Sequence, residues 1–374
     1  MNCQDGKQKM ILQNLKKWNQ GKEQPPVVMD INPTDYCNLN CLSCWQRNWK
    51  YKRLDSKEYE ISDERFLSLI DEAAEIGVQK IMITGGGEAL MRPVTKEVML
   101  KIKKKNMIGE ITTNGTLFTE DFIKKLVKAE WDKIVFSIDG PDAEINDSLR
   151  GKGSFNRVIK ALKLFKKHKE AKANKKKPVI AFNVVLSKKN YKKLDKMIEL
   201  AHKFSVDIVM FEALTIHSSH GKKLKLGKKE QDELQKFISG INKLAKKYKI
   251  VTNIDNYVQK DFISKANKMQ EVISEKNSAD KNFSSAPCFE PWYHLVVKVD
   301  GSVGPCCIFE EKTLNVKNMR LREIWYGSWF KKLRKDIING KLPKWCKICN
   351  TGQVMQNVDL RNALTKQNKK KNKN

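Results

Sequence analysis

Short apolar and β-branched runs alternate with longer helical stretches over much of the chain. The stretches between the runs carry ordinary helix boundary signals, with Ser62 and Thr119 at N-caps and Gly77 at a C-terminus. Repeated βα units of this kind build a parallel sheet. The predicted strands are Val27 to Ile31, Lys80 to Thr84, Ile108 to Thr113, Lys133 to Asp139, Val179 to Leu186 and Asp207 to Glu212. The pattern predicts an α/β fold in which residues 27–215 form a partial (βα)6 TIM-like barrel.

The pattern changes after residue 215. Two helical stretches, Lys229 to Lys249 and Asp261 to Lys276, are predicted with no further strand between them. We expect residues 216–286 to form a helical bridge to a second module.

That second module is predicted over residues 287–350. The runs His294 to Val299 and Ser302 to Pro305 flank Asp300-Gly301, which predicts a β-hairpin with a type I′ turn. Beyond the hairpin, Leu321 to Asn339 has the periodicity of one amphipathic helix. The module is therefore expected to be a small hairpin-plus-helix domain.

Both ends of the chain are predicted to lie outside these domains. Residues 1–26 are an N-terminal extension, and residues 351–374 are a basic tail that we expect to be largely disordered, because it ends in the polar, low-complexity run KQNKKKNKN. No stretch approaches the ~20 apolar residues that span a bilayer, and the N-terminus has no apolar signal segment. We expect a soluble, cytoplasmic protein without a membrane partner.

The nine cysteines fall into two groups, with Cys3 alone in a terminus expected to fray. A reducing cytosol keeps thiols free, so clustered cysteines there indicate metal binding or catalysis rather than disulfides. The first group is Cys37, Cys41 and Cys44, and the second is Cys288, Cys306, Cys307, Cys346 and Cys349.

The formal net charge of +30 would suit a polyanionic partner. The lysines, however, are spread over every predicted helix face, and strings such as Lys175-Lys176-Lys177 lack the interleaved aromatic residues of a nucleic-acid stacking platform. We interpret the charge as a solvated surface, with RNA or an acidic substrate as the alternative.

The first cysteine group has the spacing C-x3-C-x2-C and follows the first predicted strand directly. Three thiolates ligate only three irons of a cubane cluster and leave the fourth iron open, as in catalytic metal sites. Zinc sites and ferredoxin-type clusters more often use C-x2-C pairs, and a structural site would need a fourth ligand close by. The spacing, followed by the aromatic Trp45, resembles the signature of the radical S-adenosylmethionine (SAM) superfamily.

That resemblance implies a [4Fe-4S] cluster on Cys37, Cys41 and Cys44 whose open iron binds SAM, with cleavage to a 5′-deoxyadenosyl radical that abstracts hydrogen. It also implies a set of SAM-binding residues. Trp45 would lie beside the adenine, the run Gly85-Gly86-Gly87-Glu88 resembles the family's GGE motif that holds the SAM amino group, and Ser137 and Arg150 would contact the ribose or carboxylate. Asn114 and Asp139 join the set as polar side chains at strand ends, although simple turn chemistry explains both residues equally well.

Cys288, Cys306, Cys346 and Cys349 could close either a structural zinc site or a fully ligated [4Fe-4S] cluster. The C-x12-G-x4-C element resembles the start of the SPASM domain, an auxiliary-cluster module of radical SAM enzymes. Full SPASM modules carry further cysteines, which this chain lacks after Cys349. The remainder resembles the shortened, single-cluster twitch form. The glycine spacing assigns Cys306 as the ligand, with Cys307 as its neighbour.

Together the two cysteine groups predict an enzyme that abstracts a substrate hydrogen and passes an electron to the auxiliary cluster, which gives a net oxidation. The substrate would be a sugar-like small molecule, and a donor such as flavodoxin or ferredoxin would supply electrons. A maturase of a ribosomal peptide is the alternative, and an iron-sulfur RNA-binding protein is the alternative from another class. His217, His220 and Glu212 lie near the expected substrate side, but no sequence feature identifies a catalytic base.

Overall fold

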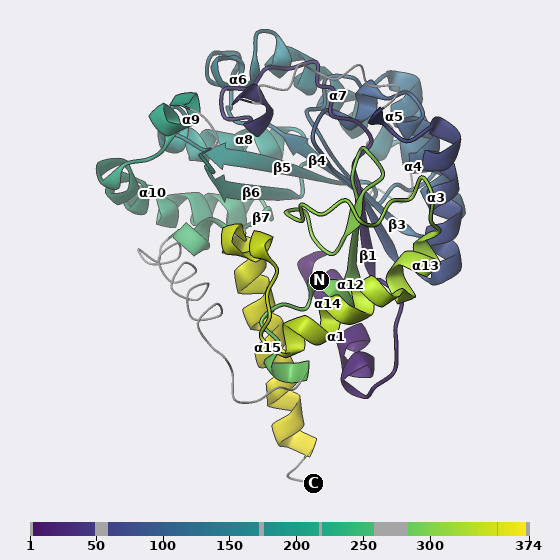
Figure 1. Ribbon diagram of the computed structural model, residues 1–374. Helices are drawn as coiled ribbons and strands as arrows, with labels where there is room; N and C mark the ends of the chain where they lie inside the picture. Colours follow the sequence, from purple (N-terminus) through teal and green to yellow (C-terminus); the bar gives the residue numbers. More distant parts are fainter. Residues whose placement is uncertain are drawn as a thin grey trace. The chain divides into compact units, whose positions relative to one another are not determined.

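The computed structural model describes residues 3–48, 59–171, 176–216, 219–257, 283–349 and 351–371 (Figure 1). Its alternating strands and helices confirm the predicted α/β class with a parallel sheet. The chain divides into two compact units. Unit 1 comprises Met1–Ile31, Glu64–Ile81 and Lys260–Asn374, and unit 2 comprises Asn32–Asp63 and Met82–Gln259. Strand β2 (Lys80–Ile83) carries the chain from the first unit into the second.

Unit 2 contains five neighbouring strands, which pair in parallel where their register is defined. They are β3 (Ile108–Thr113), β4 (Lys133–Ser137), β5 (Val179–Leu186), β6 (Ile208–Ala213) and β7 (Val251–Thr252). The α-helices of this unit are α4 (Thr95–Lys104), α5 (Glu120–Lys128), α6 (Ala143–Arg150), α7 (Ser154–Glu170), α8 (Leu194–Lys203), α9 (Ser219–Leu224) and α10 (Lys228–Lys247). Short 3-10 helices are η1 (Trp45–Asn48), η2 (Ala89–Met91), η3 (Tyr191–Lys193) and η4 (Ile254–Tyr257).

The strands of unit 2 have an outer and an inner face. On the outer face, the ring of Phe136 in β4 packs edge-on against Phe165 of α7, with 6.0 Å between ring centroids. On the opposite, inner face, Val135, Ala181 and Ile208 lie in register on three neighbouring strands and form a separate apolar cluster. Successive side chains of a strand alternate between faces, so the two clusters fix which residues point inward.

Unit 1 is built on β1 (Val28–Ile31), which pairs in parallel with β8 (His294–Val297), while β8 pairs antiparallel with β9 (Val303–Gly304). The predicted hairpin therefore extends a sheet through β1 instead of standing alone. The helices of this unit are α1 (Cys3–Asn19), α3 (Asp63–Ile76), α12 (Glu290–Tyr293), α13 (Leu321–Tyr326), α14 (Ser328–Ile338) and α15 (Thr351–Lys371), with 3-10 turns η5 (Phe283–Ser285) and η6 (Lys344–Ile348).

The turn of this hairpin differs from the predicted type I′ turn. Gly301 has φ +83°, but Asp300 is not among the described residues with positive φ. The Gly301 amide donates to the Lys298 carbonyl at 2.9 Å, and the Lys298 amide donates to Ser302 O at 2.9 Å. This pattern is a three-residue loop in which a left-handed glycine follows a turn.

Two helix predictions in unit 1 were wrong. The helix expected from Leu321 to Asn339 is broken into α13 and α14 at Gly327, whose backbone is extended at φ −72° and ψ 170°. The tail after residue 350, expected to be largely disordered, forms α15 up to Lys371 because it buries apolar side chains, among them Val354, Leu360 and Leu364. The prediction of disorder rested on the polar residues at the end of the tail and did not take these apolar residues into account. Helix α1 likewise begins at Cys3, where fraying was expected.

The helices predicted for the bridge over residues 216–286 agree in part with the structure. Helix α10 matches the first predicted stretch, but the short strand β7 follows it where no strand was expected. The second predicted stretch, residues 261–276, lies outside the described residues. Within the described part of the chain, no helix is both long and apolar enough to cross a bilayer.

The contact between Gly109 and Trp131 gives a test of the packing of unit 2. A Cβ atom on Gly109 in β3 would overlap the buried Trp131 ring, whereas Gly240 in α10 has open space around it. We therefore expect Gly109→Ala to lower the free energy of unfolding by about 1–3 kcal/mol through overpacking. Gly240→Ala should raise it by about 0.5–1 kcal/mol through helix propensity.

Urea titration of both variants beside the wild type would measure these changes. Equal midpoints for Gly109→Ala and the wild type would contradict the packing described here.

Candidate functional site

The loop after β1 brings the first three cysteines near one another. Cys37, Cys41 and Cys44 are each half-buried, and their thiols are close enough that the Cys44 charge raises the pKa of Cys37 and the Cys37 and Cys44 charges raise the pKa of Cys41. Burial is the larger cause and, with these charges, raises the pKa of Cys41 to about 11. Among the described residues, no three His, Cys, Asp or Glu side chains converge on a single ion. A cubane does not need such convergence, because each thiolate binds a different iron.

Several hydrogen bonds of unit 2 fix the cysteine loop. The Cys37 sulfur accepts from the Leu39 amide at 3.5 Å and from the Asn114 side-chain amide at 3.9 Å. The Cys41 thiol lies 3.7 Å from the Arg150 carbonyl at the end of α6. Hydrogen bonds to a sulfur ligand tune the potential of an iron-sulfur cluster. Asn114, a predicted site residue, thus contacts a cysteine of the first group directly.

The glycine run after β2 packs against the same loop. The Gly87 amide donates to Thr34 O at 2.9 Å, and the Glu88 amide donates to Tyr36 O at 2.7 Å. A Cβ atom on Gly86 would overlap the Asp35 carboxylate, and one on Gly87 would overlap the Tyr36 carbonyl. The glycines were expected to let a ligand approach. In the structure, Gly86 leaves room for the Asp35 side chain, and Gly87 lets the backbone of the cysteine loop approach.

The Glu88 side chain is buried, with 2% of its surface exposed. One carboxylate oxygen accepts from the Thr113 hydroxyl at 2.7 Å and the Leu90 amide at 3.3 Å, and the other accepts from the Asn114 amide at 2.6 Å. Burial raises the Glu88 pKa, and these donors oppose that rise. Glu88 thus ties the glycine turn to the end of β3, where Asn114 reaches Cys37.

Asp139 and Arg150, both predicted site residues, form an ion pair with 2.7 Å between Oδ2 and Nε. Burial opposes the charged guanidinium, but the Asp139 charge and the Cys41 thiolate outweigh burial and raise the Arg150 pKa. Asp139 also accepts from the Val185 amide at 2.8 Å. Ser137 ends β4 on the inner face, in register with Asn183 of β5.

Sequence reasoning missed several residues that support this site. The buried Asn190 donates to the Asp139 carbonyl at 2.8 Å, which holds the turn after β4. The buried Arg92 donates to Pro33 O at 2.9 Å and to Ile61 O at 2.6 Å. Neither residue belongs to a motif, and each acts on segments far away in the sequence.

Trp45, which the sequence analysis did predict, is half-buried at the start of η1.

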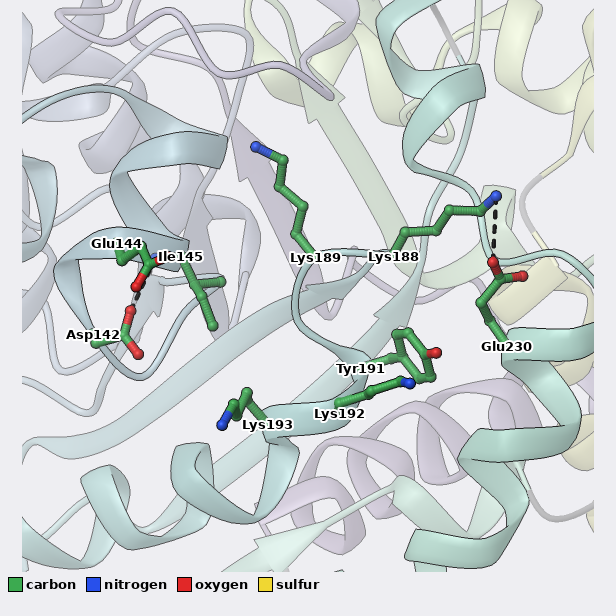
Figure 2. A pocket seen from close by; sticks show the side chains of 9 residues that line it. All are labelled: Asp142, Glu144, Ile145, Lys188, Lys189, Tyr191, Lys192, Lys193 and Glu230. Atoms are coloured by element: carbon green, nitrogen blue, oxygen red, sulfur yellow. Dashed lines mark hydrogen bonds and ion pairs between the residues drawn. The ribbon is translucent and has the colours of Figure 1, made fainter.

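The two histidine candidates and the best-defined pocket remain to be placed. His217 lies outside the described residues, and His220 is exposed on α9. A pocket of about 610 Å³ opens beside α6, η3 and the start of α10 (Figure 2). It contains no predicted cofactor residue, and it mixes charges, since Lys188 pairs with Glu230 at 3.4 Å. Four lysines and three acidic residues line this pocket, and none of the residues predicted to bind SAM is among them.

Unit 1 gathers the second cysteine group. Burial raises the pKa of Cys288, Cys306 and Cys346, that of Cys346 to about 11, and the three charges lie near one another. Cys306 and Cys346 pack with Val296 and Trp345, whereas Cys307 is exposed. The Cys349 amide donates to Cys346 O at 3.2 Å.

A buried ionic network that the sequence did not reveal lies beside these cysteines. His294 Nδ1 is 2.5 Å from Glu290 Oε2, and His294 Nε2 is 3.2 Å from Asp30 Oδ1. Burial opposes the charged imidazole, but the two carboxylates outweigh burial and raise the His294 pKa to about 10. The Glu290 charge raises the pKa of Cys288 and Cys306. His294 thus neutralises part of the negative charge around the cysteines.

Comparison with known proteins identifies the two cysteine-bearing regions. Residues 31–201 match the radical SAM superfamily, and residues 288–350 match the SPASM iron-sulfur cluster-binding domain. The chain is 26% identical over 340 residues to the AdoMet-dependent heme synthase of Methanosarcina barkeri, with 88% of this chain and 90% of that protein covered. It is 24% identical over 341 residues to the PqqA peptide cyclase of Granulibacter bethesdensis, with 88% and 81% covered.

Other relatives match part of the chain, and a solved structure has a similar fold. The chain spans about half the length of further curated relatives that it matches. The crystal structure of Streptococcus suis SuiB bound to S-adenosylmethionine has a TM-score of 0.64 at 17% identity, with 89% of this chain and 74% of that chain covered, and it shares the fold. The chain therefore belongs to the radical SAM superfamily and is a radical SAM enzyme with a C-terminal SPASM iron-sulfur cluster-binding domain.

Proposed function

We propose that the enzyme removes a hydrogen atom from a substrate C–H bond and passes the remaining electron to an auxiliary [4Fe-4S] cluster, with net oxidation of the substrate. The observation that carries this proposal is the gathering of two separate cysteine sets, one in each compact unit. When bound, the first cluster and SAM supply the hydrogen-abstracting radical, and an external reductant such as a flavodoxin or ferredoxin supplies the electron for SAM cleavage.

Within this proposal, Cys37, Cys41 and Cys44 hold the SAM-binding cluster. Their chemistry fits it, because three half-buried thiols share one loop and the Cys37 sulfur receives two hydrogen bonds. The remaining residues proposed to bind SAM are Trp45, Gly85, Gly86, Gly87, Glu88, Asn114, Ser137, Asp139 and Arg150. Among them Glu88 and Asp139 act by fixing loops, since their carboxylates are already bonded within the protein.

The auxiliary cluster is proposed to lie on Cys288, Cys306, Cys346 and Cys349. The exposed Cys307 stays outside this set, whereas Cys306 shares an apolar environment with Cys346. Four protein ligands leave no iron open, which suits electron transfer rather than substrate binding. The protonated His294 beside Glu290 moderates the negative charge near this cluster.

A ribosomal peptide is the substrate class that we propose. The PqqA peptide cyclase aligns over 88% of this chain, and a mycofactocin maturase from Mycolicibacterium smegmatis is 28% identical over 183 residues. The heme synthase that aligns over a similar length makes a tetrapyrrole-type product the second candidate.

The first test is formation of 5′-deoxyadenosine. Protein made anaerobically, reconstituted with iron and sulfide, reduced and given SAM should release 5′-deoxyadenosine. Cys37→Ala should lower the rate by more than the roughly 10–100-fold that loss of an outer-shell partner costs at a metal site, because it removes a direct ligand. Cys307→Ala is the matched control and should keep the wild-type rate. Equal rates for Cys37→Ala and the wild type would refute the cluster assignment.

The second test separates Cys306 from Cys307 and iron from zinc. Reconstituted wild-type protein should contain about eight irons per chain, four in each cluster. Cys306→Ala should reduce this to about four, and Cys307→Ala should leave it unchanged. Four irons with one zinc in the wild type would overturn the auxiliary-cluster proposal. If iron is lost in Cys307→Ala but not in Cys306→Ala, the ligand is Cys307 and not Cys306.

A further inference from the structure

The inner face of the unit 2 sheet changes in character toward the carboxyl ends of its strands. Above the row of Lys133 and Val179, the row of Val135, Ala181 and Ile208 is apolar. The next row contains Ser137, Asn183 and Met210. Since parallel strands present ligand sites at their carboxyl ends, the rows above the apolar floor face the substrate.

Glu212 lies in the row above Met210, beside Val185 of β5. Alternation along β6 puts Glu212 on the same face as Ile208 and Met210. Ser137 is two strands away, so with strands about 4.8 Å apart Glu212 lies about 10 Å across the face from the proposed SAM side. Glu212 thus belongs to the end of this face opposite the cysteine loop.

No cationic side chain of the described residues pairs with Glu212. Its side chain is exposed, yet the surrounding protein desolvates the carboxylate enough to raise its pKa, and no neighbouring positive charge contributes. Other acidic residues of unit 2 behave differently, since Glu233 and Glu230 pair with Lys192 and Lys188. An exposed but partly desolvated carboxylate gains from a cation that arrives with a ligand.

The backbone that carries Glu212 is held rigidly. The Asn253 side chain accepts from the Phe211 amide at 2.8 Å and donates to the Phe211 carbonyl at 2.9 Å. The Tyr257 hydroxyl donates to the same carbonyl at 2.9 Å. Burial and the Glu212 charge raise the Tyr257 pKa, which keeps that hydroxyl protonated. Three hydrogen bonds on one residue fix the end of β6 and therefore the direction of Glu212.

We propose that Glu212 is a substrate-binding residue whose carboxylate receives a cationic group, a primary ammonium or a guanidinium, such as a lysine or arginine side chain of a peptide. This assignment rests on the proposed function. A substrate bound in this way would place its cationic group at β6 and its reacting C–H bond toward the SAM side of the same face. A substrate with a carboxylate at that position would be repelled by Glu212.

A peptide-capture experiment tests the proposal with a random peptide library as the probe. The reconstituted full-length enzyme with SAM is incubated with acetylated, amidated octapeptides randomised at every position, and bound peptides are sequenced by mass spectrometry. The proteins compared are the wild type, Glu212→Gln, Glu212→Lys and Glu144→Gln. Glu144→Gln is the matched control, because it removes the same charge from an exposed residue of α6 in the same unit.

Lysine and arginine should be enriched at one peptide position with the wild type and with Glu144→Gln. Glu212→Gln should lose this enrichment by about three- to tenfold, the range of a single partly exposed ion pair, and Glu212→Lys should favour aspartate and glutamate instead. Identical peptide compositions for all four proteins would overturn the assignment. Thermal melting and iron content identify a variant that has failed to fold, in which case Glu212→Ala, which also removes the carboxylate, replaces it.

The same preparations separate this proposal from the proposed function. If wild-type protein forms no 5′-deoxyadenosine but its captured peptides depend on residue 212, the radical reaction is refuted and the cation site stands. If 5′-deoxyadenosine forms and the captured peptides are independent of residue 212, the cation site is refuted alone.

Discussion

The backbone contact between the glycine turn after β2 and the loop that carries Cys37 is the constraint on which the site depends. Gly86 and Gly87 lie so close to Asp35 and Tyr36 that no side chain fits between them. Two backbone hydrogen bonds join the segments. The Glu88 carboxylate then anchors the turn to the end of β3 through buried bonds, which are stronger for a charged acceptor than for a neutral one. The position of the cysteine loop follows from this brace.

Each compact unit contains one complete cysteine set together with the groups that adjust its charge. In unit 2, Arg150 and Asp139 stand beside Cys41, and Asn114 donates to Cys37. In unit 1, an acidic pair with His294 between them lies beside Cys288 and Cys306. This division suits an enzyme in which one cluster binds SAM and the other cluster accepts electrons.

The sequence predicted the features that depend on local pattern. The strand positions of β3 and β5 were predicted to the residue, and the cysteine spacing identified the family because three ligands on one short loop are a local property. Local signals also put Asn114 and Ser137 at strand ends.

Features that depend on long-range contacts could not be predicted. The motif proposes Glu88 as a SAM-binding residue, but no local pattern indicates its bonds to Thr113 and Asn114, which anchor the glycine turn to β3. The pairing of β8 with β1 joins residues about 266 positions apart, as Val28 with His294, and no periodicity encodes it. Helix α15 forms because its apolar side chains become buried, which the polar composition of its last residues concealed.

We infer that the cysteine loop can hold a cluster only because the glycine-dependent brace fixes its position. The decisive measurement is the iron content of Gly87→Ala after anaerobic reconstitution, because the added methyl group must push the turn away from Tyr36. Iron is expected to fall from about eight to about four per chain, with only the auxiliary cluster retained. Gly240→Ala, which adds the same methyl group in open space, should keep about eight irons. Full iron content in Gly87→Ala, with undiminished release of 5′-deoxyadenosine, would contradict the account.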